Sequence, residues 1–95
     1  MSTPVGSPAP HLVSVSGQDG PGIAERLFAA LAEQGVDVDD VEQVRVHGRL
    51  LLCVEVAMLP GEVDGARAAL ARRLNGSGVE VTVDPLVEAE VGHTT

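Results

Sequence analysis

The stretch that most restricts the possible folds is residues 49–59, an alternating segment that is apolar on both of its sides. One side carries Leu50, Leu52, Val54, Val56 and Met58. The other side carries Leu51, Cys53 and Ala57 between Arg49 and Glu55. A strand that is apolar on both faces is normally covered on both faces. Because the helices of a single 95-residue domain can cover one side only, we expect a second copy of the chain to cover the other side.

The composition predicts a small aliphatic core and an acidic surface. Hydrophobic residues make up 44% of the chain, but Phe28 is the single aromatic residue, so Val, Leu, Ile and Ala must fill the core. Fourteen acidic residues against six basic ones, all of them arginine, give a formal net charge of −8. An acidic chain without stacking aromatic residues is a poor candidate for binding nucleic acid or an anionic membrane. We therefore expect neither partner.

Targeting and redox signals are sparse. Residues 1–10 have neither a basic nor an apolar signal region, and their three prolines oppose regular structure, so we expect a disordered leader there. No apolar run is long enough to span a bilayer. Cys53 is the lone cysteine, so it forms no internal disulfide and has no metal-site spacing. The sequence thus predicts a cytoplasmic protein.

Apolar spacing predicts the secondary structure. Period-two alternation indicates strands near residues 12–16, 40–47, 49–59 and 79–84, and helical spacing indicates helices over 21–34 and 62–74. Gly35 supplies a left-handed end for the first helix, and Gly48 supplies the hairpin turn. In the second strand the alternation slips at Asp39 and Asp40, so this strand either begins near Asp40 or contains a bulge.

The order β-α-β-β-α-β predicts an α+β, ferredoxin-like fold, in which two helices cover one face of a four-stranded antiparallel sheet. Right-handed crossovers place the first and third strands at the centre and leave the second and fourth at the edges. We assign residues 11–85 to this domain and regard 86–95 as a tail or the start of a linker. The long second strand is then an open edge that a dimer would cover.

A glycine-rich loop, residues 16–23, joins the first strand to the first helix. Gly17, Gly20 and Gly22 allow the backbone to approach another molecule closely, and Pro21 suits the first helical position. The free amides and the positive dipole of the first helical turn can hold a carboxylate or a phosphate. The alternative is a tight strand-to-helix turn without a ligand.

The loop and the segments that follow it resemble a known family. The run Gly17-Gln18-Asp19-Gly20-Pro21-Gly22-Ile23, a helix that ends Ala32-Glu33-Gln34-Gly35-Val36, and a β-hairpin resemble the ACT domain, a regulatory amino-acid-binding module. The runs Val38-Asp39-Asp40-Val41-Glu42-Gln43-Val44 and Gly48-Arg49-Leu50 are similar to the N-terminal ACT domain of bacterial phosphoserine phosphatases. The resemblance covers about residues 10–85 and implies a regulatory part of such an enzyme.

Two departures from that pattern matter. The Asp-x-Asp-x-Thr nucleophile motif of the phosphatase domain is absent, so the chain is either part of a longer protein or a stand-alone ACT protein. Where the family often has Asp-Arg-Pro-Gly, this chain has Asp19-Gly20-Pro21-Gly22 and lacks the positive side chain. We therefore expect any anion site to rely on backbone amides alone.

The sequence offers little support for a catalytic site. His11, His47 and His93 are scattered, and Cys53 lies in an apolar strand, where a thiol is usually inert. The carboxylates of Asp37, Asp39 and Asp40 could bind a cation or act as acid and base, or they could simply form a solvated acidic turn. A metal site needs a denser ligand set. We expect this segment to have no enzyme activity, no metal and no cofactor.

The resemblance implies an amino acid bound between two copies. The α-carboxylate would lie on the loop, and the α-ammonium would be accepted by Asp37 or Asp40 of the other copy. L-Serine is the ligand that the resemblance suggests, with Gln18 or Asp40 as partner for its hydroxyl group. The predicted ligand-binding residues are Gln18, Asp19, Gly20, Pro21, Gly22, Ile23, Asp37 and Asp40.

The rival hypothesis is a purely structural dimerisation module that senses no ligand. Two copies would associate through the edge strand or through the apolar second face of the sheet. The predicted interface residues are Val41, Gln43, Leu51 and Cys53. Nucleic-acid binding on the same plan requires exposed aromatic residues and basic charge, and the sequence offers neither.

Overall fold

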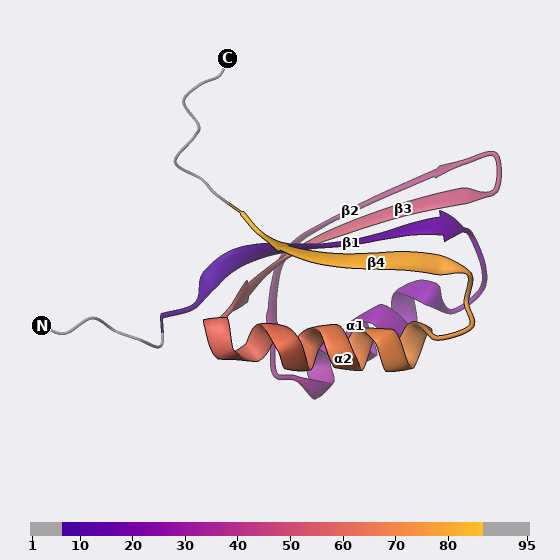
Figure 1. Cartoon of the computed structure of the whole chain (residues 1–95). Coiled ribbons are helices and arrows are strands. Elements are labelled where there is room, and N and C mark those ends of the chain that lie inside the picture. Colours follow the sequence, from indigo (N-terminus) through magenta and orange to yellow (C-terminus); the bar gives the residue numbers. More distant parts are fainter. Residues whose placement is uncertain (1–6, 87–95) are drawn as a thin grey trace, which may run out of the picture.

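The computed structural model describes residues 7–86 of the chain. Its element order confirms the predicted β-α-β-β-α-β plan, with a short 3-10 turn before the second helix (Figure 1). The elements are β1 (Ala9–Gln18), α1 (Ile23–Glu33), β2 (Asp37–Val46), β3 (Arg49–Met58), the 3-10 turn (Pro60–Glu62), α2 (Val63–Leu74) and β4 (Val79–Pro85).

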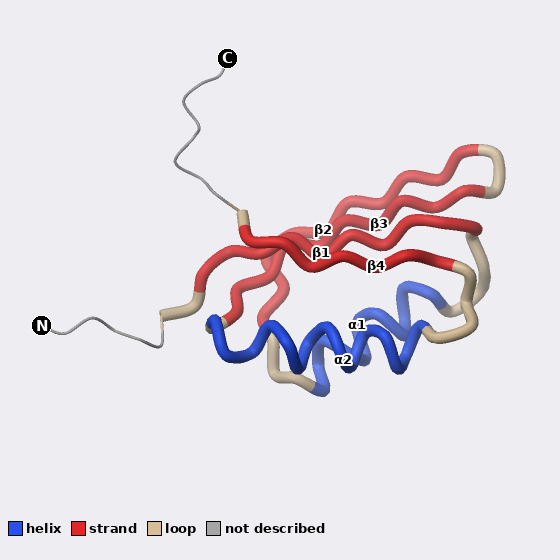
Figure 2. The backbone as a smooth tube through the Cα atoms, in the orientation of Figure 1, coloured by secondary structure: helices blue, strands red, loops and turns tan. Residues whose placement is uncertain are grey.

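The four strands form one antiparallel sheet in the order β2-β3-β1-β4, which confirms the predicted central and edge positions. Both helices lie on the same side of this sheet (Figure 2). We call the side that faces the helices the helix face and the other side the open face. The predicted ferredoxin-like α+β class is therefore correct.

Strand β1 is longer than its valine–serine alternation predicts. It pairs with β3 from Ala9, opposite Met58, to Gln18, opposite Arg49. Strand β1 thus begins at Ala9, inside the segment 1–10 that we predicted as a leader, and Pro10 belongs to the strand. Proline has no amide hydrogen to donate, but its carbonyl oxygen still accepts a hydrogen bond from the Leu86 amide at 3.0 Å. Residues 1–6 and 87–95 lie outside the described residues.

The start of α1 differs from the prediction, and its end agrees with it. Gly22 precedes the helix in the left-handed region with φ 78°, and Ile23 is the first helical residue. Pro21 therefore lies in the turn before the helix and not at its first position, because the left-handed Gly22 reverses the chain between them. At the other end Gly35 adopts φ 69°, as predicted for a left-handed helix stop.

The phase slip in β2 is a bulge. The pairing of β2 with β3 shifts between Val38 and Asp40, which leaves one extra residue in β2. The Val41 amide donates a hydrogen bond to the Asp40 carboxylate at 2.9 Å beside this bulge. The β2–β3 hairpin then turns through His47 and Gly48, both with positive φ (51° and 77°), as a tight two-residue turn requires.

The core lies between the helix face and the two helices. The predicted apolar side of β3 is buried throughout, and Val13, Val15, Leu27 and Leu70 pack against it. The exposed Glu33 carboxylate joins the two helices by accepting hydrogen bonds from Arg72 at 2.7 Å and Arg73 at 3.2 Å. These hydrogen bonds lower the pKa of Glu33 below its ordinary value of 4.5, and the hydrogen bond from Arg72 has the largest effect.

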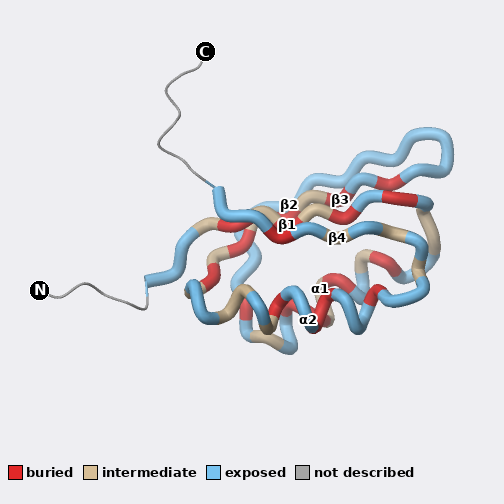
Figure 3. The backbone as a smooth tube through the Cα atoms, in the orientation of Figure 1, coloured by how far each residue is buried: buried red, intermediate tan, exposed pale blue. Residues whose placement is uncertain are grey.

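The helices leave β2 uncovered. Every residue of β2 is exposed, and the β2–β3 hairpin extends past the helices (Figures 1 and 3). The exposed large apolar residues of this hairpin lie on both faces of the sheet; they are Val38, Val41, Val44, Val46 and Leu51. The exposed apolar surface is thus concentrated on the β2 edge of the sheet and on the β2–β3 hairpin.

Candidate functional site

The glycine-rich loop is fixed at its two ends by backbone contacts. At its start, Gly17 lies so close to the end of the α2–β4 connection that a Cβ on it would approach the Gly78 carbonyl oxygen to 2.6 Å. The Asp19 amide then donates a hydrogen bond to the Gly48 carbonyl oxygen of the hairpin turn at 2.9 Å. At its far end Gly22 enters α1, where helix geometry leaves the first amides without intrahelical acceptors.

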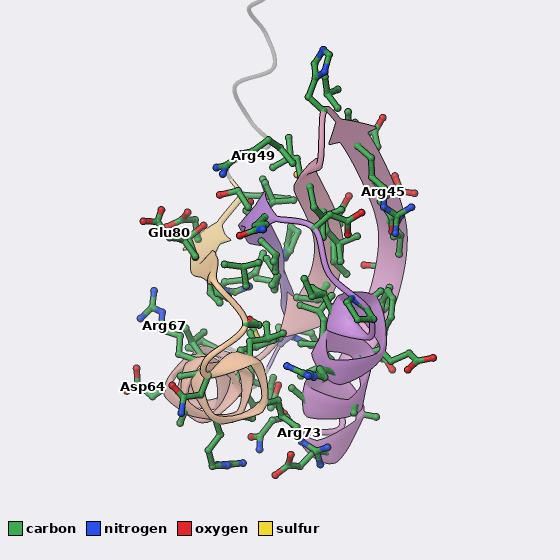
Figure 4. The ribbon with its side chains drawn as sticks, turned by 90° about the vertical axis from the view of Figure 1, so that its right-hand side faces the viewer. Arg45, Arg49, Asp64, Arg67, Arg73 and Glu80 are labelled. Atoms are coloured by element: carbon green, nitrogen blue, oxygen red, sulfur yellow. The ribbon has the colours of Figure 1, made fainter. Side chains whose placement is uncertain are left out.

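A side-chain ion pair joins the loop to the edge strand. Arg45 Nε of β2 lies 2.7 Å from Asp19 Oδ2. With its amide oriented toward the guanidinium group, Gln43 accepts from Arg45 Nη1 at 2.8 Å and from Nη2 at 3.1 Å. Asp19, Arg45 and Gln43 therefore form one polar chain beside the first turn of α1. Figure 4 shows Arg45 on the side of the hairpin opposite Arg49.

A cleft of about 230 Å³ lies between the loop, the start of α1 and β2. Its lining contains one guanidinium group, two carboxylates and one carboxamide. The lining residues are Asp19, Gly20, Pro21, Gly22, Ile23, Ala24, Glu25, Gln43, Arg45 and Leu50. A cleft that offers cationic donors and anionic acceptors a few ångströms apart suits a small zwitterion.

The structure adds the guanidinium group of Arg45 to the cleft, a side-chain donor that the prediction of backbone amides alone did not include. The missing arginine of the loop motif thus has a counterpart on β2. Sequence reasoning missed this residue because Arg45 lies 26 positions from Asp19 in the chain. The strand register could have revealed it, because Arg45 is on the helix face opposite Leu50.

Five of the eight predicted ligand-binding residues, Asp19 to Ile23, line this cleft. Gln18 is exposed and pairs with Arg49, which places it on the open face. Asp37 pairs with Ala57 and Asp40 pairs with Glu55, so both lie on the open face near the other end of β2. Within one copy the structure therefore does not bring these three residues to the cleft.

The four predicted interface residues separate into two pairs. Val41 and Gln43 lie on the helix face of the edge strand, opposite Val54 and Leu52. Leu51 and Cys53 lie on the open face, where Leu51 is 44% exposed and Cys53 is half-buried. One flat contact cannot cover both pairs.

The histidines stand apart from the cleft. His11 is buried at the start of β1, where its Nδ1 lies 2.9 Å from the Ala9 carbonyl oxygen, and His47 occupies the hairpin turn. His93 lies outside the described residues. Over residues 7–86 no three His, Cys, Asp or Glu side chains gather as metal ligands would, and no helix is long and apolar enough to cross a membrane.

Known proteins support one family. A model of the ACT domain family matches residues 10–84. The phosphoserine phosphatase SerB2 of Mycobacterium tuberculosis is 36% identical over 90 residues, which span 87% of this chain and 22% of that protein. The phosphoserine phosphatase of Streptomyces coelicolor is 46% identical over 54 residues, which span 57% of this chain and 13% of that protein. The chain thus spans less than a quarter of the length of these relatives.

A solved structure agrees with this assignment. The ligand-free regulatory subunit of aspartate kinase from Thermus thermophilus superposes with a TM-score of 0.68 at 33% identity, over 81% of this chain and 51% of that subunit. The family match extends over most of the described residues and includes the loop, the bulged edge strand and the hairpin. This chain belongs to the ACT domain family.

Proposed function

We propose that this ACT domain is a regulatory module that binds a small amino acid in the cleft beside the glycine-rich loop, and that it belongs to a phosphoserine phosphatase. The observation that carries the proposal is the cleft itself, whose lining combines the guanidinium group of Arg45 and the start of α1 with the carboxylates of Asp19 and Glu25. L-Serine is the first candidate ligand, as the resemblance to the phosphoserine phosphatases suggests. The cytoplasm is the location we expect for it.

The ligand carboxylate would lie on the amides at the start of α1 and on Arg45, and the ammonium group would lie on acidic side chains. Asp19 and Glu25 of the same copy supply the two carboxylates in the lining of the cleft. Asp37 or Asp40 of a second copy is our proposed further acceptor. Because both lie on the open face, they would have to reach around the edge of the sheet. Asp40→Asn removes an acceptor of the second copy and Glu25→Gln removes one of the same copy, so the two variants show which carboxylate binds the ammonium group.

The second copy would join at the β2 edge. Strand β2 is exposed along its whole length, so its outer backbone groups can pair with another strand. The β4 edge is less suitable, because Arg67 Nη2 already donates to the Val83 carbonyl oxygen at 2.8 Å and Pro85 has no amide hydrogen. Val41 and Gln43 would contribute to this edge contact.

The proposed regulation is a population shift. A ligand that contacts both copies favours the paired arrangement by its difference in affinity for the paired and unpaired states. A catalytic domain attached to the paired module would respond to that change. The module itself would carry no catalytic step.

Isothermal titration with a panel of amino acids, together with sedimentation analysis, tests the proposal. We expect serine or a close analogue to bind, to raise the thermal midpoint, and to increase the mass of the assembly. The absence of binding by every amino acid at millimolar concentration would rule out the sensing function.

The alternative is a structural dimerisation module, and one observation favours it. The Asp19 and Arg45 side chains already pair with each other, so the cleft has no uncompensated pair of charges to attract a ligand. Under this alternative the chain forms dimers whose mass and thermal midpoint do not change with any amino acid.

A further inference from the structure

Arg45 supplies the guanidinium group in the lining of the cleft. A guanidinium group presents two edges on which a carboxylate can accept two parallel hydrogen bonds. The side edge is formed by Nε and the terminal nitrogen next to it, and the end edge is formed by the two terminal nitrogens, Nη1 and Nη2. Which groups occupy these two edges decides how a ligand can bind to Arg45.

Side chains of the chain itself occupy both edges. Asp19 Oδ2 lies 2.7 Å from Nε on the side edge. On the end edge, the Gln43 carboxamide oxygen accepts from Nη1 at 2.8 Å and from Nη2 at 3.1 Å. Gln43 and Arg45 lie two residues apart on β2, so their side chains share the helix face of this strand. A ligand carboxylate can therefore accept two parallel hydrogen bonds from Arg45 only if it displaces one of these acceptors.

The two acceptors differ in how easily they can be displaced. Asp19 is charged, and its backbone is held by the hydrogen bond from its amide to the Gly48 carbonyl oxygen at 2.9 Å. Its displacement would leave an unpaired carboxylate beside the carboxylate of the ligand, which is unfavourable. Gln43 is neutral and exposed, so its carboxamide can turn into water and form new hydrogen bonds there. Displacement of Gln43 is thus the less costly of the two.

We propose that the Gln43 carboxamide holds the place of the ligand carboxylate on the end edge of Arg45, and that Gln43 is a specificity-determining residue of the cleft. The ligand binds by exchanging its carboxylate for the Gln43 oxygen, while Asp19 stays on the side edge. This inference rests on the proposed function, because it concerns the ligand of the same cleft.

The exchange restricts the class of ligand. A carboxylate accepts stronger hydrogen bonds from a guanidinium group than a neutral carboxamide does, so a carboxylate gains free energy when it replaces the Gln43 oxygen. A neutral amide or ester gains nothing from the same exchange. The cleft therefore selects an amino acid with a free α-carboxylate over its amide, its ester or the same residue within a peptide chain.

Two substitutions at position 43 test the exchange in opposite directions. In titration calorimetry we expect Gln43→Leu to bind L-serine about threefold to tenfold more tightly than the parent, because the competing hydrogen bond is gone. Gln43→Glu places a carboxylate on the end edge and should weaken serine binding about tenfold or more. Glu42→Gln changes the neighbouring residue, which lies on the open face opposite Cys53. It is the matched control and should bind serine like the parent.

A second ligand and a spectroscopic signal distinguish the exchange from a general change in the cleft. L-Serinamide keeps the ammonium and hydroxyl groups of serine but lacks the carboxylate, so Gln43→Leu should not bind it more tightly than the parent does. In NMR spectra of the parent, serine should shift the side-chain amide signals of Gln43. The Arg45 Nε–H signal should persist, because Asp19 stays on Nε. Because Gln43 lies on the edge strand, the titrations are compared at a concentration where sedimentation gives equal masses for parent and variants.

The possible results separate this inference from the proposed function. If the parent binds serine and Gln43→Leu binds it equally or more weakly, the exchange is wrong and the proposed function stands. If the parent binds no amino acid but Gln43→Leu binds serine, the exchange is right, Gln43 closes the cleft, and the sensing function fails. If neither protein binds serine, or if Gln43→Leu gains as much affinity for serinamide as for serine, the inference is overturned.

Discussion

The Asp19 carboxylate and the Arg45 guanidinium group lie 2.7 Å apart, and they join the glycine-rich loop to the edge strand across 26 residues of sequence. Both side chains keep contact with solvent, with 28% and 56% of their surface exposed. An ion pair of this kind contributes at most about 1 kcal/mol to stability. Its main consequence is the position of the guanidinium group beside the cleft.

Replacement of this arginine should separate binding from stability. We expect Arg45→Met to weaken amino-acid binding about tenfold or more, since a hydrogen bond to a charged group contributes about 1.5–3 kcal/mol. The free energy of unfolding should fall by less than about 1 kcal/mol. Titration calorimetry and urea unfolding measure the two effects. Arg73→Met, which removes an exposed charge far from the loop, is the control and should leave the affinity unchanged.

The left-handed glycine at the start of α1 should be essential for the shape of the cleft. Gly22→Val puts a β-branched residue at φ 78°, which costs about 1–2 kcal/mol or forces the loop into another conformation. We expect ligand affinity to fall in titration calorimetry. At Gly20 a Cβ would meet only the end of the Ile23 side chain at 3.7 Å. Gly20→Ala should therefore bind like the parent, and equal loss in both variants would contradict this account of the loop.

The first glycine of the loop should matter for folding. In Gly17→Ala the new Cβ would lie 2.6 Å from the Gly78 carbonyl oxygen and 2.8 Å from the Val79 Cα, so backbone must move. We expect the free energy of unfolding to fall by roughly 1–3 kcal/mol, as is typical of overpacking. At Gly61 nothing lies within 4 Å of an added Cβ. Urea unfolding of Gly61→Ala should match that of the parent.

The link between the helices should make stability depend on pH. Arg72 and Arg73 lower the pKa of Glu33 in the folded state, so the contribution of this carboxylate is fully present above the unfolded-state pKa. It is lost as the pH falls through the lowered folded-state pKa. We expect Glu33→Gln to lower the thermal midpoint at neutral pH. The difference between variant and parent should vanish in acid, and a pH-independent difference would refute this role.

The fold could be predicted because its signals are local. The alternation of Leu50 to Met58 and the helical row of Ile23, Leu27 and Leu31 identify their elements without tertiary information. The β2 bulge was visible as a phase slip for the same reason. The first residues of β1 could not be predicted, because Pro10 opposes a strand locally and is held there by pairing with β3 and by Leu86.

The site was only partly predictable, because it depends on which residues the sheet brings together. The glycine-rich loop has a local motif, so Asp19 to Ile23 were identified. The places of Arg45, Asp37 and Asp40 depend on the strand register and on the bulge, which decide the face that each side chain occupies. No spacing within the loop contains that information.

The hydrogen bond from the Asp19 amide to the Gly48 carbonyl oxygen has a thermodynamic consequence. It ties the loop that borders the cleft to the turn between β2 and β3, so the cleft and the exposed β2 edge are linked through one backbone contact. If a cleft occupant shifts this contact, assembly through the β2 edge changes with occupancy. The effect is then reciprocal: whatever factor the occupant adds to assembly, assembly returns to the affinity of the cleft.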